Sequence, residues 1–125
     1  GEALVVTAVQ DEPREQALRA AGATVLHLPG ADGRVDLHAL LAHLGAAQCN
    51  EVLIEAGATL AGAALRAGLV DELVVYMAPT LLGSSARPLF ELPFTAMEQR
   101  VGLEITDIAA VGKDWRITAT PLTSP

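Results

Sequence analysis

The sequence predicts an α/β fold with a mainly parallel central sheet and an antiparallel hairpin near its C-terminal end. Up to Pro79, short apolar runs rich in β-branched residues alternate with segments of helical periodicity. Strands joined by helices in this way favour parallel pairing through right-handed crossovers. The last two apolar runs instead alternate residue by residue, as half-exposed antiparallel strands do.

Start and stop signals bound the elements of the first 79 residues. Pro13 suits the first turn of a helix that Gly22 ends. Asp36 is expected to cap a second helix with leucines along one face, and Gly68 to end a third. Strands are expected at 3–9, 23–28, 51–55 and 72–78, the first and third of them buried, and helices at 14–21, from 36 onward, and at 59–67.

The composition of the chain changes after the last of these strands. Residues 81–93 contain glycine, serine and proline and are expected to form a loop. Residues 103–108 and 115–120 alternate apolar and polar side chains, and Gly112 lies between them. This pattern predicts an antiparallel hairpin at a sheet edge or across a subunit interface. Residues 121–125 are expected to be a frayed tail.

Composition restricts the classes of function. A chain of 125 residues is expected to form one domain. Fifteen acidic and eight basic residues give a formal net charge of −7, which argues against nucleic acid as a partner because binding it needs a basic face. No apolar run reaches the ~20 residues of a membrane helix. The single Cys49 excludes an internal disulfide framework and favours a reducing compartment. We therefore expect a cytoplasmic protein.

The stretch from Glu51 to Leu65 is the main candidate for a functional site. Its strand is expected to end at Glu55, Gly57 allows a tight turn, and Thr59 is a suitable N-cap for the following helix. This arrangement directs free backbone N–H groups and the positive end of a helix dipole at a ligand, frequently a phosphate. The motif is neither a GxGxxG fingerprint nor a Walker A loop.

Two residues of this stretch have two interpretations each. Gly62 inside the helix costs ~1 kcal/mol relative to alanine unless a neighbour must approach closely, and either a sheet or a nucleotide is such a neighbour. Glu55 is placed where open α/β sheets bind ligands. It is placed equally well to accept N–H groups from the helix that follows.

The sequence gives little support to other kinds of functional site. His38 and His43 are five residues apart, so they diverge by ~140° on a helix, and with one cysteine they assemble no zinc site. The signature of a zinc nucleobase deaminase is absent. Ser84 and Ser85 form no nucleophile elbow and are expected to be turn residues. Arg87 is the best single candidate for reaching a ligand phosphate, although a solvated arginine is the more common situation.

Several motifs recur in order: E-A-G-A-T-L-A-G from Glu55, G-L-V-D-E-L from Gly68, A-P at Ala78 and L-L-G at Leu81. Together they resemble the reductase domain of the bifunctional riboflavin-biosynthesis deaminase/reductase, which belongs to the dihydrofolate-reductase-like superfamily. The resemblance extends through nearly all of the chain. It implies the three-layer fold of that superfamily, with the mainly parallel sheet and C-terminal hairpin already expected.

The resemblance also implies an activity and a set of site residues. The activity is NADPH-dependent reduction of 5-amino-6-(5-phosphoribosylamino)uracil to 5-amino-6-(5-phosphoribitylamino)uracil. Glu55 matches the substrate-contacting glutamate of the family. Ala56 stands where many members have glycine, and Thr80 where many have lysine. No proton donor is identified. The positions that match the NADP-contacting stretch are Gly57, Ala58, Thr59, Leu60, Ala61, Gly62 and Ala63.

The family's reductase domain is longer than this chain, and its first strands have no counterpart in front of Gly1. Residues 1–125 are therefore expected to be the C-terminal portion of that domain, whose full-length parent carries an N-terminal zinc deaminase domain. Alone, the chain is expected to have residual NADPH affinity at best, and no detectable turnover. A homodimer is expected, with apolar surface supplied by Tyr76, Met77, Leu103, Ile105, Ile117 and Ala119.

Two alternatives remain at this point. One is a non-catalytic fragment that acts as a folding or dimerisation module. The other is a different dihydrofolate-reductase-like enzyme that reduces another pterin or pyrimidine. Titration with NADPH separates the first from a reductase, and a comparison of substrates separates the second.

Overall fold

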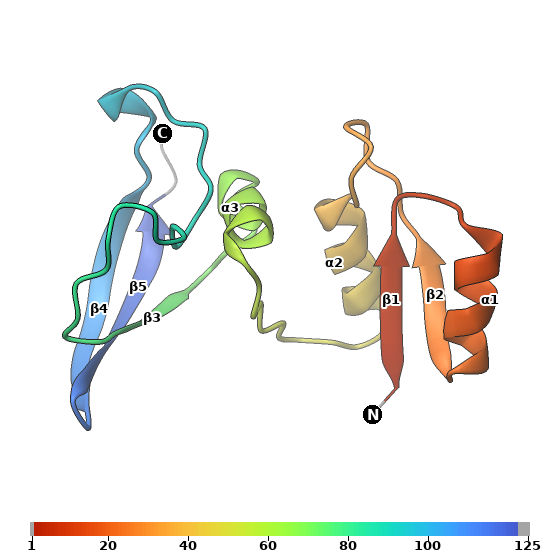
Figure 1. The fold of residues 1–125 in the computed structure, drawn as a ribbon, viewed down its shortest axis with the longest axis horizontal. Coiled ribbons are helices and arrows are strands. Elements are labelled where there is room, and N and C mark those ends of the chain that lie inside the picture. The colour runs from red at the N-terminus through yellow and green to blue at the C-terminus, as the bar shows by residue number, and fades with distance from the viewer. Residues whose placement is uncertain (1, 123–125) are drawn as a thin grey trace. The chain divides into compact units, whose positions relative to one another are not determined.

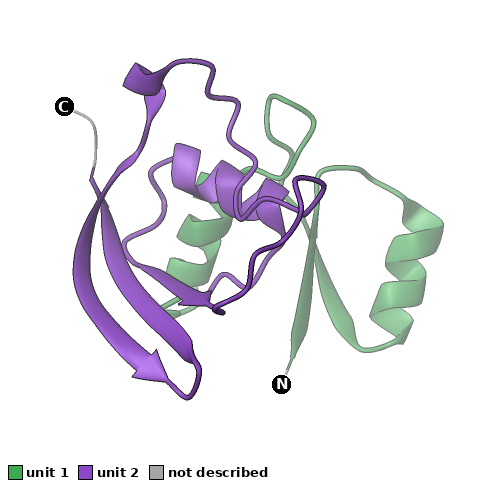
Figure 2. Ribbon diagram, turned by 60° about the vertical axis from the view of Figure 1, so that its left-hand side comes forward, with its two compact units in different colours: residues 1–52 green, residues 53–125 purple. Residues whose placement is uncertain are grey.

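The computed structural model describes residues 2–122, and the chain divides into two compact units (Figure 2). The first unit, residues 1–52, contains β1 (Ala3–Thr7), α1 (Glu12–Ala20), β2 (Ala23–His27) and α2 (Leu37–Ala46). The second unit, residues 53–125, contains α3 (Ala58–Arg66), β3 (Leu73–Met77), the short 3-10 helix η1 (Met97–Gln99), β4 (Gly102–Val111) and β5 (Asp114–Leu122) (Figure 1). The expected α/β class is confirmed.

In the first unit, β1 and β2 form a parallel pair joined by α1 (Figure 1). The register runs from Ala3 opposite Ala23 to Thr7 opposite His27. The pair continues past the strand ends, where the Leu28 amide donates to the Thr7 carbonyl at 2.9 Å. The first strand was expected to be buried, and this is wrong: Ala3 is exposed and the other residues of β1 are half-buried.

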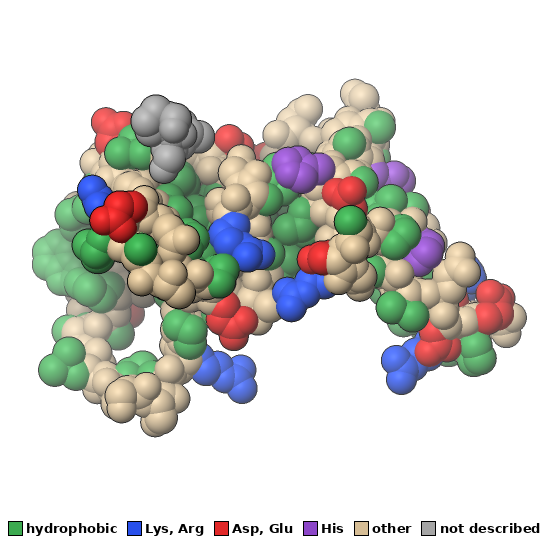
Figure 3. Space-filling view, turned by 90° about the horizontal axis from the view of Figure 1, so that it is seen from above, with side chains coloured by type: hydrophobic (Ala, Val, Ile, Leu, Met, Phe, Trp, Pro, Cys, Tyr) green, Lys and Arg blue, Asp and Glu red, His purple; other side chains and the backbone are tan. Residues whose placement is uncertain are grey.

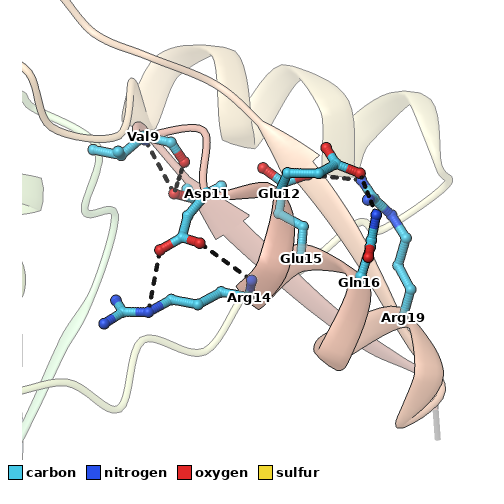
Figure 4. Close-up of polar contacts among 8 residues, drawn as sticks. Val9, Asp11, Glu12, Arg14, Glu15, Gln16 and Arg19 are labelled. Atoms are coloured by element: carbon cyan, nitrogen blue, oxygen red, sulfur yellow. Dashed lines mark hydrogen bonds and ion pairs between the residues drawn. The ribbon is translucent and has the colours of Figure 1, made fainter.

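The start of α1 is held by contacts within the helix and its cap (Figure 4). The Asp11 carboxylate accepts from the Arg14 amide at 3.2 Å and also pairs with the Arg14 guanidinium. One turn later, Arg19 pairs with Glu15 at 2.9 Å. Such i,i+4 pairs stabilise a helix by ~0.3–0.5 kcal/mol. Pro13 lies in the first turn and Gly22 follows the last, with φ of +89°, as the sequence predicts.

The start of α2 also follows the prediction. Asp36 is the N-cap, and its carboxylate accepts from the Ala39 amide at 2.9 Å. The Asp36 amide itself donates to the Leu28 carbonyl at 3.0 Å, which ties the helix start to the end of β2. His38 and His43 are exposed on this helix.

The strand expected at 51–55 does not form. These residues are coil and exposed, Leu53 with 80% of its surface accessible. Their apolar, β-branched composition suits a central strand, but a strand also needs hydrogen-bonding neighbours. Within residues 2–122, β1 pairs only with β2, and β3 pairs only with β5. Parallel pairing is therefore limited to β1 and β2 in the part of the chain that the structure describes.

The sheet of the second unit is antiparallel, in the order β3-β5-β4 (Figure 1). The expected hairpin is confirmed and is longer than predicted. The parallel orientation expected for the strand near 72–78 is wrong, because β3 lies beside β5, the returning strand of the hairpin. The expected frayed tail is also wrong for Pro121 and Leu122, which pair with β4. Residues 123–125 lie outside the described residues.

Register gives this sheet one apolar and one more polar face. Side chains directly opposite each other share a face, and a bulge at Thr106 restores the alternation in β4. The apolar face is formed by Leu73, Val75, Met77, Leu103, Ile105, Ile108, Trp115, Ile117 and Ala119. Tyr76 lies on the opposite face, and Ala119 is only 2% exposed. Five of the six residues expected to supply apolar surface therefore share this face, and the expected homodimer stays a prediction.

Arg116 and Asp107 form an ion pair on the second unit, with Arg116 Nη2 and Asp107 Oδ2 2.9 Å apart. The hydrogen bond from the guanidinium to this carboxylate, together with its negative charge, raises the pKa of Arg116. Both side chains are substantially exposed, so the pair contributes little to stability.

The best-buried hydrophobic side chains in the described residues are Ala64, Leu65 and Ala119. Two of them come from α3 and one from β5. No helix within residues 2–122 has both the length and the apolarity that crossing a membrane requires.

Candidate functional site

The start of α3 differs from the sequence prediction. Gly57, not Thr59, is the N-cap, with φ of −69° and ψ of 169°, and its carbonyl accepts from the Ala61 amide at 3.1 Å. The helix begins one residue earlier than expected, so Thr59 lies inside the first turn. Gly68 follows the helix end with φ of +67°, as predicted.

No side chain of the described residues caps α3. The amides of Ala58, Thr59 and Leu60 precede the first intrahelical donor and have no partner inside the helix. A Cβ built on Gly57 meets nothing within 4 Å, so the approach to these amides is open on that side. Backbone donors and the positive end of the helix dipole favour an anionic group at this position.

The opposite flank of the same turn is occupied by the chain itself. The Glu91 amide donates to the Ala58 carbonyl at 3.0 Å. The Thr59 hydroxyl donates to Glu91 Oε2 at 2.7 Å. A loop residue 32 positions away along the chain therefore contacts the first turn of α3 through both its backbone and its side chain.

The structure gives a reason for the glycine at position 62 that the sequence did not suggest. A Cβ at this position would overlap the Glu91 carbonyl oxygen and lie 3.0 Å from the carbonyl carbon and 3.1 Å from the amide nitrogen. Real Cβ atoms essentially never come this close to backbone without a shift. The neighbour that requires glycine in the described structure is the backbone of Glu91, rather than the sheet.

Glu55 lies in the exposed coil before α3. It does not end a strand, so the sheet-edge argument for a ligand contact is lost. The alternative, in which Glu55 accepts N–H groups of the next helix, is not seen either, because no side chain caps α3 within the described residues. Its assignment to substrate stays a prediction that rests on the family resemblance.

The residues predicted to contact the cofactor all lie between the N-cap and the second turn of α3. Leu60 is 47% exposed and Gly57 is exposed, whereas Gly62 is buried. Ala58, Ala61 and Ala63 are half-buried.

Three further residues of the prediction lie in the exposed coil after β3. Arg87 is there, together with Ser84 and Ser85, which occupy a turn as expected. Sequence reasoning missed Glu91, because a single carboxylate in a proline-containing loop carries no motif.

Figure 3 shows both acidic and basic side chains on the face that it draws. With a net charge of −7, an anionic ligand depends on local donors such as backbone N–H groups.

Helix starts with free backbone N–H groups are frequent binding places for phosphate-bearing ligands in α/β proteins. Comparison with known proteins gives the family. The pattern of the RibD C-terminal domain matches residues 1–117, and the chain belongs to this family. The described fold agrees, because RibD of Acinetobacter baumannii superposes with a TM-score of 0.81 at 36% identity, covering 95% of this chain and 31% of that protein.

Curated relatives have names from one pathway. Riboflavin biosynthesis protein RibD of Escherichia coli (strain K12) is 57% identical over 68 residues, which are 54% of this chain and 18% of that protein. The 5-amino-6-(5-phosphoribosylamino)uracil reductase of Buchnera aphidicola is 36% identical over 89 residues, 70% of this chain and 43% of that protein. A pyrimidine reductase-like protein of Corynebacterium diphtheriae has a TM-score of 0.77 at 25% identity, covering 97% of this chain and 50% of that protein. The chain thus spans less than half of the length of either curated relative.

Proposed function

We propose that this chain is part of a nicotinamide-dependent reductase that converts 5-amino-6-(5-phosphoribosylamino)uracil to 5-amino-6-(5-phosphoribitylamino)uracil in riboflavin biosynthesis. The observation that carries the proposal is the family match over residues 1–117. The 36% identity to a protein named for this reductase supports it. The two proteins named RibD support the pathway.

The cofactor that we propose is NADPH, held by residues 57–63. The first turn of α3 fits this role, because it offers backbone amides without a side-chain cap and an open approach at Gly57. When bound, the nicotinamide supplies the hydride that reduces C1 of the opened ribose. The contribution of this chain would be to bind and orient the cofactor, whose anionic part the amides of Ala58, Thr59 and Leu60 would hold.

Glu55 is proposed to bind the substrate. It is exposed two residues before Gly57, so its carboxylate is free to accept hydrogen bonds from hydroxyl or N–H groups of the aminopyrimidine substrate. The role is one of positioning, and no residue of this chain is assigned as the proton donor.

The remaining proposals concern the whole protein. We propose a homodimer, an N-terminal zinc deaminase domain in the full-length parent, and a cytoplasmic location. The relatives are longer than the segment that matches this chain, which supports the further N-terminal domain. The lone Cys49 supports the cytoplasmic location. The similarity to a pyrimidine reductase-like protein favours one rival, a reductase of another pyrimidine.

The test uses Glu55→Gln, with Glu51→Gln as a matched control from the same exposed coil. NADPH binding is followed by nicotinamide fluorescence, and substrate binding by calorimetry in the presence of NADP⁺. Glu55→Gln is expected to weaken substrate binding by about tenfold, the loss typical of one hydrogen bond to a charged group, and to leave NADPH binding unchanged. Equal losses for both ligands contradict the substrate role. Absence of NADPH binding by the full-length protein without substitutions contradicts the cofactor.

A further inference from the structure

Glu91 makes three separate contacts with the first two turns of α3. Its amide donates to the Ala58 carbonyl at 3.0 Å. Its carboxylate accepts from the Thr59 hydroxyl at 2.7 Å. Its backbone lies so close to Gly62 that no side chain fits between them. A backbone bond, a side-chain bond and a close packing contact thus converge on one loop residue.

The three contacts lie on one flank of the helix. Ala58 and Thr59 precede Gly62 by four and three residues, and residues at these two spacings are neighbours on a helix surface. The N-terminal end of the helix, where the amides of the first turn point, lies outside this flank. Glu91 consequently holds the helix from the side and leaves the donors at its end open, as the open space at Gly57 indicates.

We propose that Glu91 is a positioning residue for the cofactor-binding turn: it clips the loop onto α3 and so fixes the direction of the amides of Ala58, Thr59 and Leu60. This inference rests on the proposed function for the identity of the ligand. It assigns the Thr59 hydroxyl to Glu91 rather than to NADPH, so recognition of the cofactor by this residue is through its backbone.

The contacts of Glu91 take the place of the side-chain cap that other helices have at the residue directly before their first turn. A helix start without a side-chain cap frays readily, because its first amides are satisfied by water and its first turn has few tertiary contacts. A ligand that must bind a fraying turn has lower apparent affinity, since the competent arrangement is present only part of the time. Removing the Glu91 contact therefore weakens binding without removing any group that touches the ligand.

The experiment compares Glu91→Ala, Glu91→Gln and Thr59→Val with Glu98→Ala, an exposed acidic control from η1. Amide hydrogen exchange of residues 61–63, whose amides are the first to donate within α3, is measured by NMR in the 125-residue chain, and NADPH affinity by fluorescence titration. Glu91→Ala and Thr59→Val are expected to speed exchange and to weaken NADPH binding by about threefold to tenfold, the range for loss of one net hydrogen bond. Their double variant is expected to be no worse than either single one.

Glu91→Gln provides the rescue, because the amide oxygen of glutamine still accepts from the Thr59 hydroxyl. Exchange and affinity closer to the parent chain than to Glu91→Ala support the clip. A Glu91→Gln variant as defective as Glu91→Ala overturns it, and so does additive loss in the double variant. Circular dichroism checks that the variants are folded. If Glu91→Ala does not fold, the amide exchange and NADPH affinity of Thr59→Val alone test the clip.

Failure of the proposed function gives a different result. If the unsubstituted full-length protein does not bind NADPH while Glu91→Ala still accelerates exchange at residues 61–63, the cofactor is wrong and the clip stands. If NADPH binds and both exchange and affinity are unchanged in Glu91→Ala, the clip is wrong and the cofactor stands.

Discussion

The starts of α2 and α3 are built in opposite ways. Asp36 caps α2 from the position directly before the helix, and its carboxylate accepts from an amide three residues later. In α3 the N-cap is Gly57, without a side-chain bond, and the contact comes from Glu91, 32 residues beyond Thr59. The carboxylate cap of α2 is local, although the Asp36 amide also donates to the Leu28 carbonyl at 3.0 Å. A remote contact makes a helix start depend on how a distant loop is placed.

The two glycines inside helices repeat the contrast. Gly45 of α2 has nothing within 4 Å of a built Cβ, whereas Gly62 of α3 faces the backbone of Glu91. The same residue type is thus a tolerated weakness in one helix and a packing requirement in the other.

The largest effect is expected for Gly62→Ala. The added methyl group overlaps the Glu91 carbonyl, so the loop or the helix must move, and overpacking of this kind costs about 1–3 kcal/mol. Urea unfolding followed through amide signals of the second unit measures the loss. Gly45→Ala is the control and is expected to stabilise α2 by about 0.5–1 kcal/mol, since alanine is the better helix former. A stabilising Gly62→Ala contradicts the close contact.

A smaller effect is expected for Asp36→Ala. Loss of the bond to the Ala39 amide leaves a helix donor without its cap and destabilises the first unit by ~1 kcal/mol. Urea unfolding monitored in the first unit tests this value. The amide exchange of residues 61–63 is expected to stay at the rate of the unsubstituted chain, and acceleration there shows that the two helix starts are coupled.

The smallest effect is expected at the end of α2. Each helix is followed by a residue with positive φ, which is Gly22 after α1 and Gly68 after α3 but Gln48, at +65°, after α2. Gln48→Gly removes the strain of a side chain in this conformation and is expected to stabilise the first unit by ~0.5 kcal/mol, because greater freedom of the unfolded chain offsets part of the gain. Thermal unfolding measures the change, and a lower melting temperature refutes it.

Elements with their signals in adjacent residues could be predicted from sequence. Pro13 and Gly22 bound α1, Asp36 begins α2, and the alternation around Gly112 gives the hairpin. The failures share one cause. Residues 51–55 have the composition of a buried strand but no neighbour to pair with in the described residues. Strand direction also depends on which partner is adjacent, and β3 lies beside the returning strand of the hairpin.

In the candidate site, too, features with local signals could be predicted and contacts with distant residues could not. The sequence located the turn at Gly57 and the stretch to Ala63, and the resemblance carried by its motifs gave the family that residues 1–117 match. It misplaced the N-cap by two residues, since it put the cap at Thr59 where the helix in fact begins after Gly57. It proposed a nucleotide or a sheet as the neighbour of Gly62, and the described neighbour is a loop.

By itself, then, the sequence determined the approximate positions of α1, α2 and α3 and where these helices stop, because these depend on residue types within a few positions of one another. Its motifs, taken together, gave the family. Only the tertiary structure decided that Glu91 lies on α3 and that β3 runs antiparallel to β5. Both contacts join residues tens of positions apart. Their formation depends on the entropy of closing the loop between them and on the packing of the whole unit, quantities that no short stretch of sequence contains.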